Sequence, residues 1–135
     1  AVRSVVRRAE RSTYTSTWSQ TTITVLTDSA PGHSLAAVEL VMAPGGASSR
    51  RLETRAHDTF ATVLAGTLTL LSETGETALE VGDSAYLAAG AAYAWANRGA
   101  VPATLLLVGS SGQVDLVQDV LALTNDAPAP FDDTL

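Results

Sequence analysis

The chain has no cysteine and no lysine among its 135 residues. The missing cysteine excludes disulfide bonds, thiolate metal ligands and a cysteine nucleophile. No apolar run approaches the roughly 18 residues that a transmembrane helix needs. The opening sequence AVRSVVRRAER also lacks the apolar stretch of a signal peptide. We therefore expect a cytoplasmic protein that does not enter a membrane.

Positive charge is scarce, because eight arginines oppose 14 acidic residues and leave a net charge of −6. Such a surface repels phosphate groups, so we expect neither nucleic acid nor an anionic membrane as a partner. Hydrophobic residues make up 46% of the chain and charged residues 16%, which is typical of a folded globular protein. At this length we expect one domain over residues 1–135.

Short segments with apolar residues at alternate positions follow one another along most of the chain. Each is rich in Val, Thr, Leu or Tyr and is bounded by turn-forming residues, as expected for β-strands. The six clearest segments cover residues 22–27, 35–42, 59–71, 84–90, 92–97 and 103–109. Short strands in this number and spacing predict an all-β sandwich or barrel.

Two further segments are ambiguous. Residues 14–20 are compatible with another strand, and residues 113–123 fit a short C-terminal helix but also fit a strand in part. We expect a barrel core at about 20–110 and a C-terminal extension at 111–135. The end of this extension has two prolines and three acidic residues, so we expect a loose segment or an arm on a neighbouring subunit.

Two stretches resemble the conserved motifs of the cupin superfamily. The first cupin motif is similar to residues 45–70, GGASSRRLETRAHDTFATVLAGTLTL, with a polar strand and then an apolar strand that ends in a VLxGxL turn. The second is similar to residues 82–97, GDSAYLAAGAAYAWAN. Its fixed positions hold Gly82, Asp83, Gly90 and Asn97. The resemblance implies a single-domain cupin barrel of the jelly-roll type, commonly dimeric.

The same resemblance implies where a metal would be held. Cupins use two histidines and an acidic residue of the first motif and one histidine of the second, a set that suits a divalent metal. The corresponding positions here hold Glu53, Arg55, Thr59 and Tyr93. Arginine is permanently protonated, so it cannot coordinate a cation and repels one nearby. We therefore expect a barrel that has lost its metal and uses no cofactor.

An irregular metal site stays open as an alternative. His57 has the same parity as Glu53 and Arg55, so in an unbroken strand it would face the same side. His33 is the other histidine of the chain, although it is equally compatible with an exposed loop. If a metal is bound, we expect His57, Glu53 and His33 to hold it.

The motif alignment predicts a polar row inside the barrel, with Tyr86 near its mouth. Burying charge without partners is costly, so such a row normally faces a cavity that holds water or a ligand. We predict that His57, Glu53 and Tyr93 act in catalysis. The side chains predicted to bind substrate are Arg51, Arg55, Thr59, Tyr86 and Trp95. The simpler alternatives are a structural Glu53–Arg55 ion pair and a packing role for Trp95.

Three functions are compatible with this row. The first is a metal-independent enzyme with acid–base chemistry on a small organic molecule, such as a cyclase, isomerase or dehydratase. In it His57 moves a proton, Arg55 holds an anionic oxygen and Tyr93 donates a hydrogen bond. The others are a non-catalytic binding barrel and a metal-dependent oxygenase or isomerase with irregular ligands. We favour the first, because charged inward residues are retained where every metal ligand is replaced, and we expect a homodimer.

Overall fold

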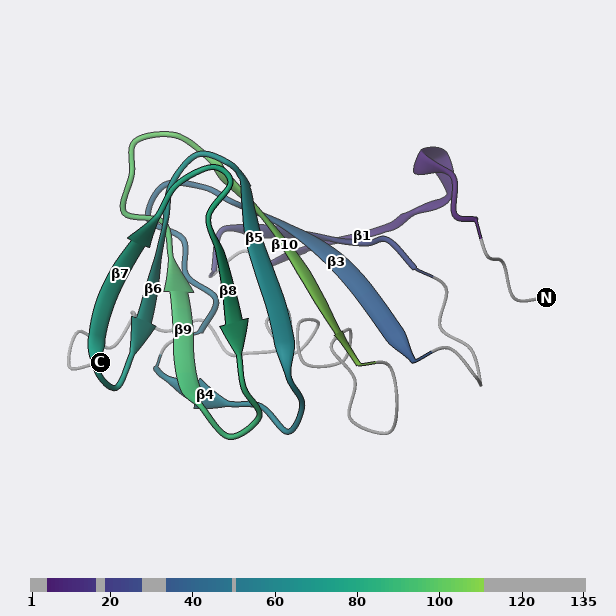
Figure 1. Ribbon diagram of the computed structural model, residues 1–135. Helices are drawn as coiled ribbons and strands as arrows, with labels where there is room; N and C mark the ends of the chain where they lie inside the picture. The colour runs from purple at the N-terminus through teal and green to yellow at the C-terminus, as the bar shows by residue number, and fades with distance from the viewer. Residues whose placement is uncertain (1–4, 17–18, 28–33, 50, 111–135) are drawn as a thin grey trace.

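The computed structural model describes residues 5–16, 19–27, 34–49 and 51–110, and His33 and the segment 111–135 lie outside this part (Figure 1). Apart from a short 3-10 helix, η1 (Arg8–Glu10), its regular elements are strands. They are β1 (Ser12–Ser16), β2 (Thr21–Val25), β3 (Leu35–Met42), β4 (Glu53–Thr54), β5 (Thr59–Ala65), β6 (Leu68–Ser72), β7 (Gly75–Leu79), β8 (Ser84–Leu87), β9 (Ala92–Ala96) and β10 (Ala103–Ser110). The predicted all-β class is confirmed.

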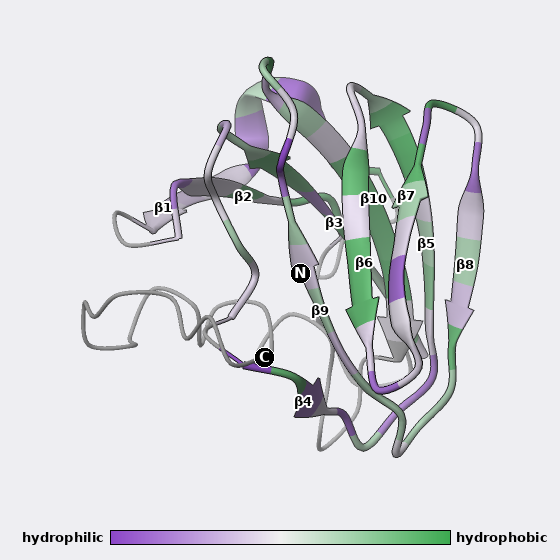
Figure 2. Ribbon diagram, turned by 90° about the vertical axis from the view of Figure 1, so that its left-hand side faces the viewer, coloured by the Kyte–Doolittle hydropathy of each residue, from purple (hydrophilic) through white to green (hydrophobic). Residues whose placement is uncertain are grey.

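The strands form two antiparallel sheets, in the orders β1-β2-β3-β10-β5-β8 and β4-β9-β6-β7. Figure 1 shows the two sheets as the walls of a jelly roll, as predicted, with β1 and η1 reaching away from the smaller sheet. Hydrophobic residues dominate β6 and β10, whereas β4 is hydrophilic (Figure 2). No helix in the described part of the chain is long and apolar enough to cross a membrane.

Side-chain alternation builds the core between the sheets. In β3 the even-numbered residues are buried and in β10 the odd-numbered ones are, whereas in β5 Thr59, Ala61 and Val63 are buried. Leu105 in β10 pairs with Leu40 in β3 and with Val63 in β5, and all three side chains are buried. Burying a leucine or valine stabilises the fold by about 1.5–3 kcal/mol. This end of the barrel is closed by large aliphatic side chains.

The opposite end of the same sheet has a row of small inward residues. Gly109 pairs with Ala36 on one side and with Thr59 on the other, and Thr59 pairs with Leu87 in β8. All four residues are buried. Glycine, alanine and threonine fill less volume than the leucines and valine of the other row.

The predicted segment 59–71 is divided by a tight turn at Gly66 into β5 and β6. Gly66 has φ = +71°, which L-residues rarely adopt. A Cβ atom there would lie 2.7 Å from the Pro102 carbonyl oxygen. The motif's Asn97 has a structural part, since its Nδ2 donates to the carbonyls of Met42 (2.8 Å) and Val101 (2.9 Å).

The polar strand predicted around residues 51–57 is interrupted. β4 comprises Glu53–Thr54 alone, and β5 does not start until Thr59. The alternation that we used to place His57 therefore does not run through 55–58, and its position comes from other contacts. In addition, β1 begins upstream of the expected barrel core.

Candidate functional site

The site begins at the pairing of β4 with β9. Glu53 lies directly opposite Tyr93 in this antiparallel pair, and directly opposed residues project to the same face of a sheet. Tyr93 is buried and belongs to the main core cluster, whereas Glu53 is half-buried. The smaller sheet therefore places a carboxylate beside an aromatic wall at the mouth of the barrel.

Arg55 joins these two side chains. Its Nη1 lies 3.4 Å from Glu53 Oε2, and its guanidinium carbon lies 5.9 Å from the centroid of the Tyr93 ring. The Arg55 side chain is only 17% exposed, against 44% for Glu53. The ion-pair contact is longer than the 2.7–2.9 Å of a strong charge-assisted hydrogen bond. A cation is thus held in a partly dry position, near the Glu53 carboxylate and over the Tyr93 ring.

His57 is buried next to Thr59, at the start of β5. Its Nδ1 lies 3.3 Å from the carbonyl oxygen of Asp58 and 3.3 Å from Thr59 Oγ1. Because a carbonyl oxygen only accepts hydrogen bonds, the contact with Asp58 favours the tautomer that carries its proton on Nδ1. Nε2 is then the nitrogen with the lone pair, the arrangement that a general base requires.

Trp95 lies two residues farther along β9, on the same face as Tyr93 and toward the closed end. It pairs with Leu70 in β6, and its side chain is 2% exposed. Its main chain is fixed by Ser48, whose Oγ accepts from the Trp95 N–H at 2.8 Å. Its indole Nε1 is buried without a hydrogen-bond partner among the described residues. Trp95 therefore forms the floor below the Glu53–Arg55–Tyr93 group.

Two of the predicted site residues lie elsewhere. Arg51 is exposed, and the structure shows it accepting a hydrogen bond from Ser49 Oγ (2.7 Å) through its carbonyl oxygen. Tyr86 is 68% exposed and lies opposite Phe60 on the outer face of the larger sheet. The structure thus brings Glu53, Arg55 and Tyr93 together, with His57 and Thr59 at the nearby row of small residues. Tyr86 is directed away from the inside.

Sequence reasoning did not single out Asp58, which accepts hydrogen bonds from the Tyr86 hydroxyl and from the Ala89 N–H (2.8 Å). The Tyr86 hydrogen bond, then that of Ala89, lowers the pKa of Asp58, and the carboxylate in turn raises the pKa of Tyr86. A further hydrogen bond joins the same two segments, because the Gly90 N–H donates to the Arg55 carbonyl oxygen at 2.9 Å. These hydrogen bonds hold residues 55–58, including His57, against β8 and the β8–β9 turn.

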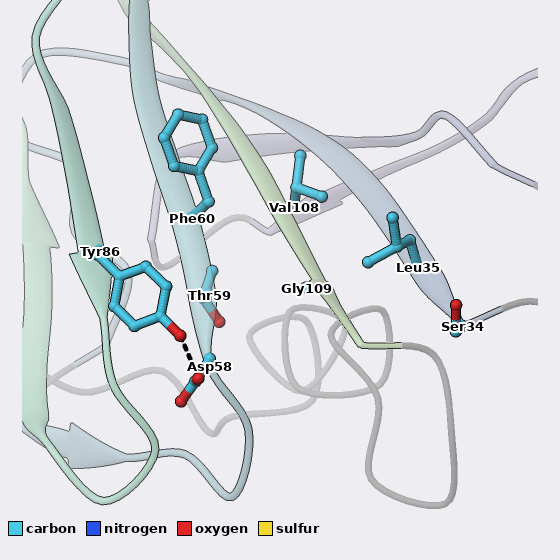
Figure 3. Close-up of a pocket in the computed structure, with 8 residues that line it drawn as sticks. All are labelled: Ser34, Leu35, Asp58, Thr59, Phe60, Tyr86, Val108 and Gly109. Carbon is cyan, nitrogen blue, oxygen red and sulfur yellow. Dashed lines mark hydrogen bonds between the residues drawn. The ribbon is translucent and has the colours of Figure 1, made fainter.

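A cavity of about 430 Å³ opens beside the hydrogen bond between Tyr86 and Asp58 (Figure 3). The close-up shows the Tyr86 hydroxyl directed at Asp58, with Phe60, Val108 and Leu35 along the neighbouring strands. The residues that line the cavity are Ser34, Leu35, Asp58, Thr59, Phe60, Tyr86, Val108 and Gly109. Since Phe60 pairs with both Tyr86 and Val108, these side chains lie on the outer face of the sheet.

The residues at the metal-ligand positions do not suit a metal cation. Within the described ranges no group of three or more His, Cys, Asp or Glu side chains comes together. The carboxylate of Glu53 already faces the guanidinium of Arg55, and the other two positions hold a threonine and a tyrosine. A permanent cation beside the single carboxylate opposes binding of a second one.

A jelly-roll barrel built from two antiparallel sheets is the architecture of a cupin. The cupin domain model matches residues 38–109, more than half of the chain, and the protein belongs to the cupin family. The predicted family membership is confirmed. No curated protein sequence matches the chain.

Solved structures agree with this assignment. A sugar phosphate isomerase of the cupin superfamily from Silicibacter pomeroyi is 26% identical, with a TM-score of 0.62 over 76% of this chain and 69% of that one. The polyketide cyclase RemF from Streptomyces resistomycificus is 16% identical, with a TM-score of 0.69 over 82% and 81%. An RmlC-like cupin from Shewanella frigidimarina is 14% identical, with a TM-score of 0.68 over 82% and 93%. The last two likenesses concern the fold alone.

Proposed function

We propose that this cupin is a metal-independent enzyme that performs acid–base chemistry of the cyclase, isomerase or dehydratase type on a small organic molecule in its barrel. The observation that carries the proposal is the position of Arg55, half-buried against Tyr93 and Glu53 where the family places a metal ligand. A fixed guanidinium supplies the positive charge that a developing oxyanion needs. A structural neighbour named as a sugar phosphate isomerase, which is 26% identical, supports an enzymatic role.

Each group has a role that its contacts suggest. Nε2 of His57 accepts a proton from a carbon next to a carbonyl, while Thr59 and the Asp58 carbonyl hold the ring in place. Arg55 stabilises the enolate oxygen that forms, and Tyr93 positions the guanidinium by a cation–π contact. Glu53 keeps Arg55 oriented or takes a second proton. No step of this scheme uses a metal.

The proposal is tested by turnover in the presence of a chelator. Candidate substrates are sugar phosphates and poly-β-carbonyl compounds, both of which carry acidic C–H bonds beside a carbonyl. We expect turnover to survive EDTA, His57→Gln to reduce it about 100-fold, and Arg55→Gln to reduce it by a similar factor. The matched control is Arg98→Gln, because Arg98 forms an exposed ion pair with Glu76 on the far side of β9 from β4.

Two other functions are distinguished by the same assays. A non-catalytic binding barrel would bind these molecules without turning them over. A metal-dependent enzyme would contain about one equivalent of a transition metal and lose activity in EDTA, and either result would contradict the proposal. The lack of cysteine is compatible with the cytoplasmic location that we expect for such an enzyme.

We also propose that the protein forms a homodimer. The apolar side chains of Leu35, Phe60 and Tyr86 are exposed on one outer face of the larger sheet, and contiguous apolar surface of this kind favours a protein partner. Strand β1 and the 3-10 helix η1 reach outward, and Arg7, Arg8 and Arg11 are exposed there, whereas the chain as a whole has a charge of −6. This charge complementarity favours a second copy of the chain as the partner.

Light scattering on purified protein tests the dimer. We expect twice the chain mass for the wild type and a monomer for Phe60→Asp, because a charge would be buried at the centre of the contact. Leu64→Asp is the matched control, since Leu64 is also exposed on β5 but does not line the outer cavity. A wild-type monomer, or a Phe60→Asp dimer, would refute this interface.

A further inference from the structure

The indole N–H of Trp95 is a buried hydrogen-bond donor without a partner among the described residues. Leaving such a donor unsatisfied in a folded core costs about 1–3 kcal/mol. The Oγ of Ser19 is also buried without a partner, but a hydroxyl rotates and both donates and accepts. An indole N–H is a fixed donor. Trp95 therefore indicates a missing acceptor in a way that Ser19 does not.

The position of Trp95 connects this donor with the proposed site. Trp95 and Tyr93 are alternate residues of β9 and both belong to the core cluster, so they face the interior together. Alternate residues of a strand are about 7 Å apart. Arg55 lies over the ring of Tyr93. A charged donor and a neutral donor are thus stacked along one aromatic wall, one near the mouth and one deeper.

We infer that the barrel binds a planar organic acid that carries two oxygen functions: an anionic oxygen held by Arg55 and an uncharged acceptor oxygen held by Trp95 Nε1. This inference rests on the proposed active site and names its substrate class. A ring with a carboxylate at one end and a hydroxyl or keto oxygen at the other offers one acceptor to each donor. The rings of Tyr93 and Trp95 offer flat surfaces for such a molecule.

Small residues face the interior from the larger sheet. Gly109, Ala36 and Thr59 are adjacent in three neighbouring strands and face the interior. The wall opposite to them is β9 with its aromatic side chains. A flat ligand fits between an aromatic wall and a wall of small residues, whereas a bulky branched one does not.

The test compares two probes, 4-hydroxybenzoate and benzoate, by titration calorimetry on the full chain. They share the carboxylate and differ in the second oxygen. We expect the wild type to bind 4-hydroxybenzoate about tenfold more tightly, the discrimination expected for one hydrogen bond that satisfies a buried donor. Trp95→Phe should abolish this preference and leave benzoate binding nearly unchanged. Arg55→Gln should weaken both probes alike, and Tyr14→Phe, which removes an exposed hydroxyl on β1, should change neither.

A second measurement does not require the Trp95→Phe variant to fold. The wild-type protein has two tryptophans, so its indole N–H groups give two NMR resonances, which a Trp18→Phe variant assigns. We expect the Trp95 resonance to move downfield with 4-hydroxybenzoate and not with benzoate. Equal affinity for the two probes, or a stationary Trp95 resonance, would overturn the inference.

The outcomes separate this inference from the proposed function. If turnover depends on His57 but neither probe binds, the enzyme proposal stands and the inferred substrate class is wrong. If the probes bind with the expected preference but no candidate substrate is turned over, the ligand class stands and the enzyme proposal fails.

Discussion

The two ends of the barrel use the same strands and the same alternation but different side-chain sizes. At the closed end, β3, β10 and β5 contribute Leu40, Leu105 and Val63 in register, and at the open end they contribute Ala36, Gly109 and Thr59. Alternation alone decides that these residues face inward. Their volumes differ, because leucine and valine are large and alanine, glycine and threonine are small. His57 contacts Thr59 at the end with the small residues.

The largest effect is expected at the closed end. Leu105→Ala removes a fully buried side chain and leaves a cavity, so we expect the free energy of unfolding to fall by about 2–5 kcal/mol. Thr59→Ala at the open end deletes fewer atoms beside existing space and should cost clearly less, on the order of 1 kcal/mol. Urea denaturation measures both values. Equal losses would mean that the two ends are packed alike.

Filling the open end should separate function from stability. Ala36→Leu places a larger side chain next to Gly109 and Thr59, so we expect ligand binding to fall at least tenfold while the free energy of unfolding changes by less than about 1.5 kcal/mol. Calorimetric binding of 4-hydroxybenzoate and urea denaturation provide the two measurements. A loss of stability above about 3 kcal/mol would show that the row is already close-packed.

The smallest effect is expected for the hydrogen bond between the Tyr86 hydroxyl and the Asp58 carboxylate. The pKa of Asp58 is lowered in the folded protein, so its stabilising contribution is present above the unfolded value of about 3.9 and is lost as pH falls through the folded value. The pKa of Tyr86 is raised, so its contribution is present below about 10 and is lost as pH rises through the folded value. Tyr86→Phe should move the pKa of Asp58 back toward its ordinary value.

Carboxyl NMR titration of Asp58 measures this shift, and hydrogen exchange at the Ala89 amide reports the hydrogen bond from Ala89 to Asp58. We expect faster exchange of this amide in Tyr86→Phe and no change at Leu105, which belongs to the closed end. An unchanged Asp58 titration would mean that Tyr86 does not hold the carboxylate in solution.

The barrel was predictable because period-two alternation is a local property. The strands at 35–42, 92–97 and 103–109 were predicted nearly to their ends, and the turn at Gly66 was predicted from the VLxGxL motif. The grouping of Glu53, Arg55 and Tyr93 was also predictable, because the cupin motifs fix the register of β4 against β9. Tyr86 was not correctly placed at the site, because its neighbourhood depends on which face of β8 meets the interior.

The sequence by itself determined the strand pattern, the family and the replacement of metal-ligand types by Glu53, Arg55, Thr59 and Tyr93. Only the tertiary structure decided that Arg55 is held against both Glu53 and Tyr93, that Asp58 ties His57 to the β8–β9 turn, and that the indole of Trp95 is buried without an acceptor. Alternation acts between neighbours in the chain. Hydrogen bonds and burial depend on residues up to dozens of positions apart, whose meeting is fixed only when the sheets close.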